Sequence, residues 1–293
     1  SSQVVTKKLN LANYQKRNNK NKNIKMLNLI KKYELSQIKQ KKLFNFAKKN
    51  KIDFLSSAFD LDSLDFLIKV LKLKILKIPS GEITNFPYLK KVAKAKKYVV
   101  LSTGMSNFLE IKKALKVLTS HGLKKNKITL LHCNTAYPTP FKNVNLNVLN
   151  KIKDKFKTNI GYSDHTLGIE VSIAAVALGA RVIEKHFTLN NNWEGPDQKA
   201  SLDVKELNTM IKAIRNIDVS KGSSIKSITQ SEKQNVFFAR KSIVAKKNII
   251  KGERFSEKNL TVKRPGNGIS PMKWNSIMKK KSKFNFKKDD QIK

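Results

Sequence analysis

Two of the four histidines in this 293-residue chain stand at the ends of short apolar segments that are typical of neighbouring strands. His165 follows the segment 159–162, and His186 ends the segment 182–186. Because adjacent strands lie about 5 Å apart, two imidazoles at neighbouring strand ends can bind one divalent metal ion. A core histidine is also often a hydrogen-bonded structural residue, so the spacing alone leaves both interpretations open. Glu184 shares the strand face of His186, and a buried carboxylate there must be paired or functional.

A second group of polar residues follows two further apolar segments. Lys77 lies near the end of one, with Ser80 and Glu82 just after it, and Ser102 lies at the end of the next. A lysine at a strand end can bind a phosphate or form a Schiff base. The run that begins at Ser102, Ser-Thr-Gly, can donate hydroxyl and backbone hydrogen bonds to an anion. In a chain so rich in lysine, an ordinary lysine at a strand edge is the competing interpretation.

Two more residues have both a chemical and a structural interpretation. Asp197 follows Glu194-Gly-Pro after the last apolar segment, where a loop could face a substrate or simply turn. Cys133 is the only cysteine, which excludes an internal disulfide and fits a reducing cytoplasm. It has no base nearby in sequence beyond His132, so we expect a buried structural thiol.

The elements that would position these residues alternate in type along the chain. After a segment at 22–50 with helical spacing, short apolar runs alternate with amphipathic helical patterns. The predicted strands are 52–56, 75–78, 98–101, 128–132, 159–162 and 182–186. The predicted helices are 61–70, 86–95, 107–119, 145–156, 168–178 and 203–217. Crossovers of helix length predict a parallel sheet, and strands this apolar are buried on both faces.

The position of the polar residues favours a closed barrel over an open sheet. No GxGxxG follows the first strand, which weakens a dinucleotide-binding sheet. Polar residues instead follow nearly every strand, which is the arrangement of a TIM-barrel active site. A (β/α)8 barrel has eight strands and the pattern gives six, so we expect an α/β TIM barrel lacking its first two strands. We expect this partial barrel at 1–220, a linker at 221–238 and a small domain at 239–293.

The composition sets limits on function. Lysine and arginine total 61 against 21 acidic residues, a net charge of +40 that raises nucleic-acid binding as a hypothesis. The lysines are spread over the whole chain and few aromatic residues lie among them, which favours solvated helix faces instead. No apolar run is long enough to cross a membrane, and the first residues are not typical of a signal peptide. We therefore expect a cytoplasmic protein.

Several longer motifs occur in an order that resembles a known family. The chain resembles the sialic acid synthases, that is, N-acetylneuraminate synthases and their legionaminic-acid relatives, and its tail resembles their SAF domain, an antifreeze-like β-clip. The motifs are Lys77-Ile-Pro-Ser-Gly-Glu-Ile-Thr-Asn, Leu101-Ser-Thr-Gly-Met, Leu131-His-Cys-Asn-Thr-Ala-Tyr-Pro-Thr-Pro, Gly161-Tyr-Ser-Asp-His-Thr-Leu-Gly, Glu184-Lys-His-Phe-Thr, Gly195-Pro-Asp and Val262-Lys-Arg-Pro-Gly-Asn-Gly.

This resemblance implies an activity and roles for individual residues. The implied reaction condenses phosphoenolpyruvate with the open-chain aldehyde of an N-acetylated hexosamine, releases phosphate and makes a nine-carbon 2-keto acid. His165 and His186 would bind Mn²⁺ or Mg²⁺, which polarises the aldehyde and positions a water molecule. The implied catalytic residues are Lys77, Glu82, His165 and His186. The implied substrate-binding residues are Ser57, Ser80, Ser102, Tyr137, Ser163, Asp197 and Arg264. Of these, Ser102 and Ser163 would bind phosphoenolpyruvate together with Lys77, Asp197 would bind sugar hydroxyls together with Glu82, and Tyr137 would line the pocket. Arg264 would reach the N-acetyl group from the other subunit of a domain-swapped homodimer.

The chain departs from the family pattern in two ways. The family's first strand, with a catalytic glutamate, and its second, with a lysine for phosphoenolpyruvate, are not found. The order Asn134-Thr135 is closer to legionaminate-type members than to neuraminate synthases. The acceptor is therefore either N-acetylmannosamine or a 2,4-diacetamido-trideoxyhexose. The alternatives are a non-catalytic remnant that binds sugar or metal and, less favoured, a basic nucleic-acid-binding protein.

Overall fold

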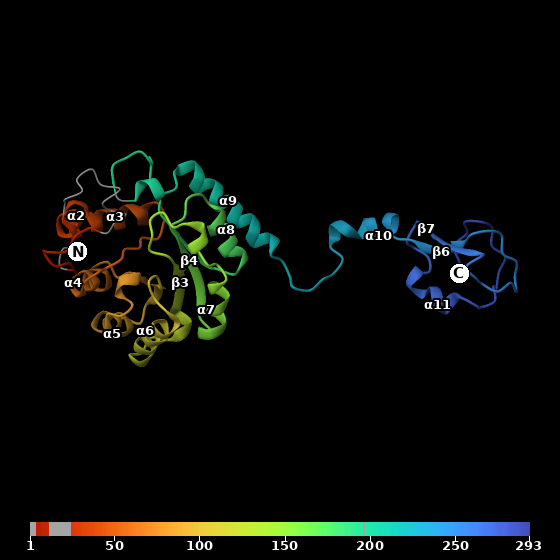
Figure 1. The fold of residues 1–293 in the computed structure, drawn as a ribbon, viewed down its shortest axis with the longest axis horizontal. Helices are drawn as coiled ribbons and strands as arrows, with labels where there is room; N and C mark the ends of the chain where they lie inside the picture. The colour runs from red at the N-terminus through yellow and green to blue at the C-terminus, as the bar shows by residue number, and fades with distance from the viewer. Residues whose placement is uncertain (1–3, 12–24, 196) are drawn as a thin grey trace. The chain divides into compact units, whose positions relative to one another are not determined.

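Five parallel strands form the centre of the first of two units in the chain (Figure 1). The computed structural model describes residues 4–11, 25–195 and 197–293. The units are Ser1–Gly222 and Ser223–Lys293, and each has its own hydrophobic core. Two parts of the sequence patterns, residues 22–24 and Pro196, lie outside the described residues.

The sheet of the first unit has the strand order β1-β2-β3-β4-β5, with every neighbouring pair parallel. A doubly wound sheet would reverse its order at a switch point, and this one does not. The order is that of consecutive staves in a barrel wall, so the prediction of a partial TIM-type barrel is confirmed. The strands are β1 (Ile75–Ile78), β2 (Tyr98–Ser102), β3 (Ile128–Cys133), β4 (Asn159–Asp164) and β5 (Val182–Lys185).

The strand predicted at 52–56 was wrong. Among the described residues, this segment forms no strand, and the residue after it, Ser57, makes one parallel bridge with Lys77. Ile52 and Leu55 are exposed, so this short apolar run is not buried on both faces as a central strand would be. Three residues beyond that bridge, Asp60 already begins the next helix, because its side chain accepts a hydrogen bond from the backbone N–H of Ser63. The parallel pairing with β1 therefore ends after a single bridge and is too short to form a strand.

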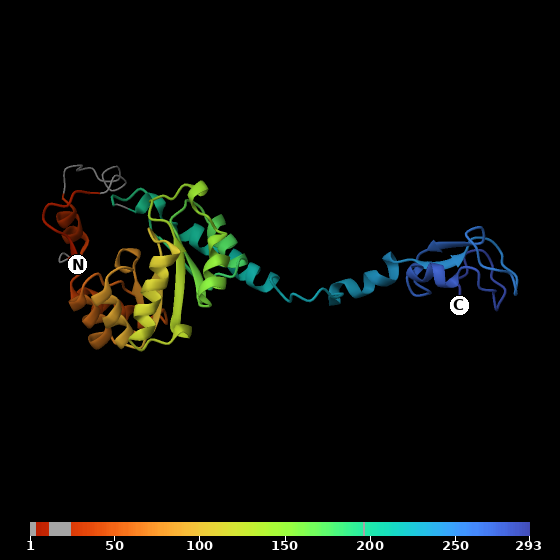
Figure 2. The same ribbon diagram turned by 60° about the horizontal axis from the view of Figure 1, so that its bottom comes forward.

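Helices follow the strands in the predicted places and wrap the outside of the sheet (Figure 2). The predicted helix 61–70 is one α-helical turn continued by a π-helical turn, Phe66–Val70. The α-helices of this unit are α2 (Met26–Tyr33), α3 (Gln37–Lys49), α4 (Leu61–Asp65), α5 (Phe86–Lys94), α6 (Phe108–Ser120), α7 (Val148–Phe156), α8 (Glu170–Ala177) and α9 (Val204–Ser220).

Local sequence explains where two of these helices begin. Asn107 caps α6 by accepting hydrogen bonds from the next turn, while the Glu110 carboxylate accepts from the Asn107 N–H. Asp203 and Glu206 form the same reciprocal pair at the start of α9. Each cap is worth about 1 kcal/mol, and both motifs are readable from the sequence.

The two faces of the sheet have different chemistry. The face toward the helices carries the hydrophobic core, in which Leu76, Ile78 and Leu101 pack against residues such as Tyr88 and Leu149. Alternate strand residues point the other way, and these positions hold the polar side chains of the predicted site. The fold therefore separates a stabilising face from a chemical one.

One glycine lets the strands of the site approach each other. A Cβ atom at Gly161 would lie 2.4 Å from Leu131 Cδ2 and 2.5 Å from the Val182 carbonyl oxygen. Any other residue at this position in β4 would push apart the neighbouring strands β3 and β5. The close approach also sets the distance between the ends of β4 and β5, where the two histidines lie.

The second unit is small. Its strands β6 (Ser242–Ala245) and β7 (Leu260–Lys263) pair antiparallel. The stretch expected to be a linker, 221–238, includes most of helix α10 (Lys233–Ala239), and a further short helix, α11 (Trp274–Ile277), follows the strands. The core of this unit is Ile243, Ala245, Ile249, Phe255, Leu260, Phe286 and Ile292. Within residues 4–11, 25–195 and 197–293, none of the helices is long and apolar enough to cross a lipid bilayer.

Burial of His132 in β3 predicts how stability changes with pH. Its Nε2 lies 2.8 Å from the Val144 carbonyl oxygen, and burial lowers the pKa of the imidazole. The unfolded chain takes up a proton near pH 6.5 while the folded chain resists it. The free energy of unfolding therefore falls as the pH drops below about 6.5, by at most about 1.4 kcal/mol per pH unit for one proton.

We expect this loss to be smaller in His132→Gln, which keeps a donor but cannot titrate. Urea unfolding of the metal-free protein at pH 7.5 and pH 5.5 measures the effect. An equal loss in both proteins would show that His132 does not contribute.

Candidate active site

Most of the predicted site residues line one cavity at the carboxyl ends of the strands, with a volume of about 860 Å³. The described residues that line it come from the ends of the five strands and the loops after them, from the segment 57–59 and from helix α2. They are Met26, Ile30, Ser57, Phe59, Lys77, Pro79, Ser80, Gly81, Ser102, Met105, Cys133, Thr135, Tyr137, Ser163, His165, Glu184, Lys185 and His186. The fold therefore brings most of the predicted strand-end residues into one cavity.

Lys77 is the centre of a hydrogen-bonded group on the inner face of the sheet. Its side chain is 6% exposed, and its Nζ donates to Ser102 Oγ at 2.8 Å and lies 3.3 Å from Glu184 Oε2. Ser163 Oγ donates to the other oxygen of Glu184 at 2.7 Å. The group combines a buried cation with two hydroxyls, which is a donor set for an anion such as a phosphate or carboxylate. Glu184 supplies the counter-charge.

The two histidines lie side by side. The ring centroids of His165 and His186 are 5.3 Å apart, and Tyr137 packs 4.2 Å from the first ring and 5.6 Å from the second. His165 Nδ1 lies 2.6 Å from the Asn134 carbonyl oxygen. Because a carbonyl can only accept, Nδ1 carries the proton and Nε2 keeps a lone pair. Burial lowers the pKa of His165, which favours the neutral ring.

This arrangement fits a metal held partly by protein and partly by other ligands. A metal-binding histidine usually donates its second N–H to a carbonyl or carboxylate, as His165 does to Asn134. In the part of the chain that the structure describes, no three histidine, cysteine, aspartate or glutamate side chains gather as a complete cation site. Mn²⁺ and Mg²⁺ commonly keep several water or substrate oxygens, so two imidazoles are a sufficient protein contribution.

Three predicted residues lie outside the lining of the cavity. Asp197 Oδ2 is 4.0 Å from His186 Nδ1, so it lies beside the site. Glu82 ends the short turn that begins at Ser80, where its carboxylate accepts a hydrogen bond from Asn85 Nδ2. Arg264 belongs to the second unit, where its Nε donates to the Ala239 carbonyl oxygen.

Cys133 is buried, as expected, and its Sγ lies 3.3 Å from Ser80 Oγ. It also lines the cavity, which the sequence pattern did not predict. Ser80 accepts a hydrogen bond from the Gly104 N–H, so the loops after β1 and β2 are joined. The thiol thus packs beneath the loops that shape the site.

The prediction missed the apolar part of the cavity. Met26 and Ile30 from α2, with Phe59 and Met105, line it together with the charged groups. No pattern in the sequence marks Met26 and Ile30, because helix α2 lies far from the strand ends in sequence and reaches the cavity only through tertiary packing. Glu184 was recognised by its strand position, but its ion pair with Lys77 joins β5 to β1, the two outer strands of the sheet, and so depends on the curvature of the folded sheet.

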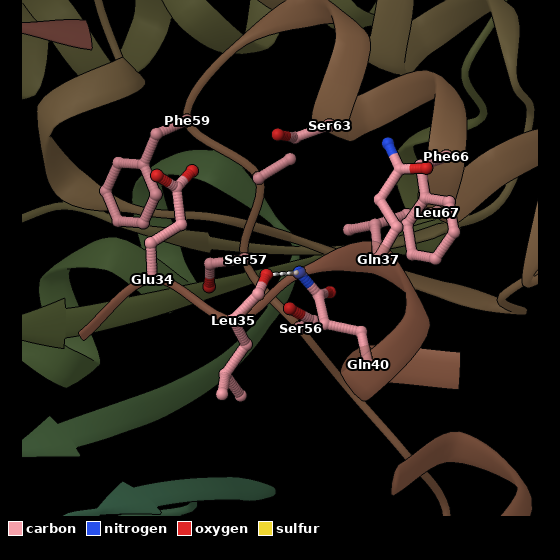
Figure 3. Close-up of a pocket in the computed structure, with 11 residues that line it drawn as sticks. Glu34, Leu35, Gln37, Gln40, Ser56, Ser57, Phe59, Ser63, Phe66 and Leu67 are labelled. Atoms are coloured by element: carbon pink, nitrogen blue, oxygen red, sulfur yellow. Dashed lines mark hydrogen bonds between the residues drawn. The ribbon is translucent and has the colours of Figure 1, made fainter. Parts of the chain in front are cut away.

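A smaller cavity of about 160 Å³ adjoins the first and shares Ser57 and Phe59 with it (Figure 3). Gln40 reaches across it and donates to the Leu35 carbonyl oxygen at 3.2 Å. Ser57, predicted to bind substrate, therefore lies between the two cavities.

Comparison with known proteins agrees with this geometry. The model of the NeuB family matches residues 1–226, and that of the SAF domain matches residues 240–293. The chain is 52% identical to N,N'-diacetyllegionaminic acid synthase of Campylobacter jejuni, over 91% of this chain and 79% of that protein. It is 38% identical to the protein of the same name from Legionella pneumophila, over 97% and 80%. Identity to human N-acetylneuraminate-9-phosphate synthase is 34%, over 88% and 72%.

Solved structures give the same picture. The N-acetylneuraminic acid synthetase of Leptospira borgpetersenii superposes with a TM-score of 0.68 at 32% identity, over 76% of each chain. A putative spore coat polysaccharide biosynthesis protein of Chromobacterium violaceum shares the fold with a TM-score of 0.75 at 24% identity, over 92% of this chain and 80% of that one. The resemblance expected from the motifs is confirmed: the chain belongs to the NeuB family of sialic acid synthase-type proteins and carries a SAF domain.

Proposed function

We propose that this protein condenses phosphoenolpyruvate with the open-chain form of a 2,4-diacetamido-trideoxyhexose to make a nine-carbon 2-keto acid of the legionaminic type. The observation that carries the proposal is the buried Lys77 with Ser102 and Ser163 beside the His165–His186 pair in one cavity. The two relatives named as N,N'-diacetyllegionaminic acid synthases support the choice of acceptor. We place the reaction in the cytoplasm.

Phosphoenolpyruvate would bind at the cationic end of the cavity. The Lys77 ammonium and the hydroxyls of Ser102 and Ser163 would donate to its phosphate or carboxylate oxygens. Without substrate, Glu184 satisfies both Lys77 and Ser163, so an incoming anion competes with this carboxylate for the same donors. Ser57 and Ser80 line the same cavity and would complete the contacts.

The atoms of the reaction balance without a further reactant. C3 of phosphoenolpyruvate forms a bond to the aldehyde carbon, and a water molecule adds to C2. The C2–O bond to phosphate then breaks and the oxygen from water becomes the keto oxygen. One proton of that water ends on the new sugar hydroxyl and the other on phosphate.

His165 and His186 would hold Mn²⁺ or Mg²⁺. When bound, such an ion supplies Lewis acidity toward the aldehyde oxygen. The protein's own contribution is to keep the His165 ring neutral and to fix both rings, through burial and the hydrogen bond from His165 to Asn134 and through the packing of Tyr137.

The acceptor sugar would occupy the rest of the cavity. Asp197, beside His186, and Glu82 are proposed to bind its hydroxyls. The apolar side chains Met26 and Ile30 suit a sugar that lacks an oxygen and carries acetyl groups. By family resemblance, Arg264 would contact an acetamido group from a second copy in a domain-swapped homodimer.

The second candidate function is binding of the same ligands without turnover. It is favoured by the strand count, because the described residues form five parallel strands and a (β/α)8 barrel has eight. Nucleic-acid binding remains a weaker alternative that leaves the cavity unexplained.

Phosphate release tests the proposal. The purified chain is incubated with phosphoenolpyruvate and either N-acetylmannosamine or 2,4-diacetamido-2,4,6-trideoxymannose, with Mn²⁺ or with EDTA. We expect release with the diacetamido sugar in Mn²⁺, at least about tenfold slower release with N-acetylmannosamine, consistent with lost apolar contacts, and none in EDTA. Metal and phosphoenolpyruvate binding without phosphate release would favour the second candidate instead.

A further inference from the structure

A buried ion pair is formed by the residues that precede the two histidines, which alternate along β4 and β5 with Ser163 and Glu184; Lys185 is also among the residues that line the cavity. Asp164 precedes His165 at the end of β4, and Lys185 precedes His186 at the end of β5. Lys185 Nζ lies 2.9 Å from Asp164 Oδ2, with side chains 3% and 0% exposed. The two residues are also direct partners in the sheet, at the last pair of the β4–β5 ladder.

Every oxygen of the Asp164 carboxylate has a hydrogen-bond partner. Oδ1 accepts from the Thr166 N–H at 2.9 Å and from its hydroxyl at 2.7 Å. Oδ2 accepts from Ser172 Oγ of α8 at 2.6 Å, in addition to Lys185. Lys185 Nζ also donates to the Thr166 carbonyl oxygen at 2.7 Å. The residues on both sides of His165 are therefore tied to the residue that precedes His186.

Stability alone does not explain such a pair. Removing two charges from water costs several kcal/mol per ion, and apolar residues of similar size often serve as well or better. The pair does orient the backbone next to the two histidines. The β4–β5 ladder ends at Asp164 and Lys185, and the chain leaves the sheet at the next residue on each strand. The ion pair and its hydrogen bonds hold the two backbones where the ladder no longer does.

We propose that Asp164 and Lys185 are positioning residues that fix the separation and direction of the two imidazoles, and through them the affinity for a divalent cation. This inference rests on the proposed role of His165 and His186. It gives the buried residues that precede the two histidines a function in the site, and it accounts for a charged pair at positions that are 3% and 0% exposed.

The test is a double variant that leaves the net charge unchanged, Asp164→Asn with Lys185→Met. Because one negative and one positive charge are removed together, a change in cation affinity reports geometry rather than local charge. Mn²⁺ binding to the full chain is measured by electron paramagnetic resonance of the free ion. We expect the dissociation constant to rise by about 10–100-fold, as for other lost outer-shell partners.

The matched control is Asp65→Asn with Lys91→Met, which removes a lysine–carboxylate pair of 2.8 Å between α4 and α5, away from the cavity. It also conserves net charge, and we expect its Mn²⁺ affinity to stay within about twofold of the original, as for surface pairs worth about 0–1 kcal/mol. Thermal unfolding of each metal-free protein establishes that the binding measurements refer to folded chains.

Ser172→Ala is the milder variant if the double variant does not fold. It removes one hydrogen bond to Asp164 and little volume, and we expect a roughly three- to tenfold weaker affinity. If the original chain binds Mn²⁺ through both histidines and these variants bind it equally well, the positioning role is overturned while the proposed function stands. If the original chain does not bind Mn²⁺, both the metal site and this inference fail.

Discussion

Replacement of Lys77 by methionine is expected to lower kcat/KM for phosphoenolpyruvate by about 10²–10³-fold. The ammonium is 6% exposed and hydrogen-bonded to Ser102, so it is already desolvated and aimed at the cavity before substrate arrives. Removal of one partner from a hydrogen-bonded charge pair between a protein and its ligand typically costs about 2–5 kcal/mol of binding free energy, and each 1.4 kcal/mol is tenfold in affinity. Methionine keeps the length of the side chain, so the loss reports the charge.

The control for this variant is Lys91→Met. Lys91 also pairs with a carboxylate, that of Asp65, but it lies on α5 outside the cavity. We expect its kinetics to match the original chain. A Lys77→Met protein that is folded and retains kcat/KM within about threefold, or about 0.7 kcal/mol, would remove the anion site from the proposal.

Replacement of either His165 or His186 by alanine is expected to abolish measurable Mn²⁺ binding, with a loss of affinity beyond the roughly 10–100-fold typical of an outer-shell change. Each ring would supply one of only two protein ligands, because the described residues offer no complete three-ligand set. Calorimetry with Mn²⁺ measures the loss directly. Phosphate release should fall with it, and added metal should not restore it.

His121→Ala is the control for the histidine variants. This ring is hydrogen-bonded to the Val117 carbonyl oxygen at the end of α6 and does not line the cavity. We expect unchanged Mn²⁺ binding. Binding that survives loss of His165 or His186, or that disappears equally with His121, contradicts the assignment of the metal ligands.

Much of the barrel wall could be predicted because its elements obey local rules. The apolar runs that became β1 to β5 are the right length for buried parallel strands, and capping residues such as Asn107 and Asp203 mark where helices begin. The polar residues follow from the same rules, since parallel strands bring their carboxyl ends to one edge. His165 and His186 could therefore be placed together from the sequence.

The errors have a common cause. The segment 52–56 has a strand pattern, but a strand also needs a partner along its length, and only Ser57 makes a bridge. Met26 and Ile30 line the cavity through packing of a distant helix. The sequence carries none of this tertiary information in local form.

The Asp164–Lys185 pair could be predicted from the sequence only in part. Both residues are part of the motifs that carry the family resemblance. Alternation along each strand points them away from the side chain that precedes each of them, but their ion pair depends on the register in which Asp164 faces Lys185. That register becomes visible only in the folded sheet.

The most direct test of the proposed condensation is the fate of an oxygen label. Phosphoenolpyruvate, the diacetamido sugar and Mn²⁺ are incubated with the protein in water enriched in ¹⁸O, and the released phosphate is examined by ³¹P nuclear magnetic resonance. If the C2–O bond breaks, the phosphate is unlabelled while a nine-carbon 2-keto acid accumulates. Phosphate that has gained ¹⁸O would show attack at phosphorus, which is simple hydrolysis and contradicts the proposed reaction.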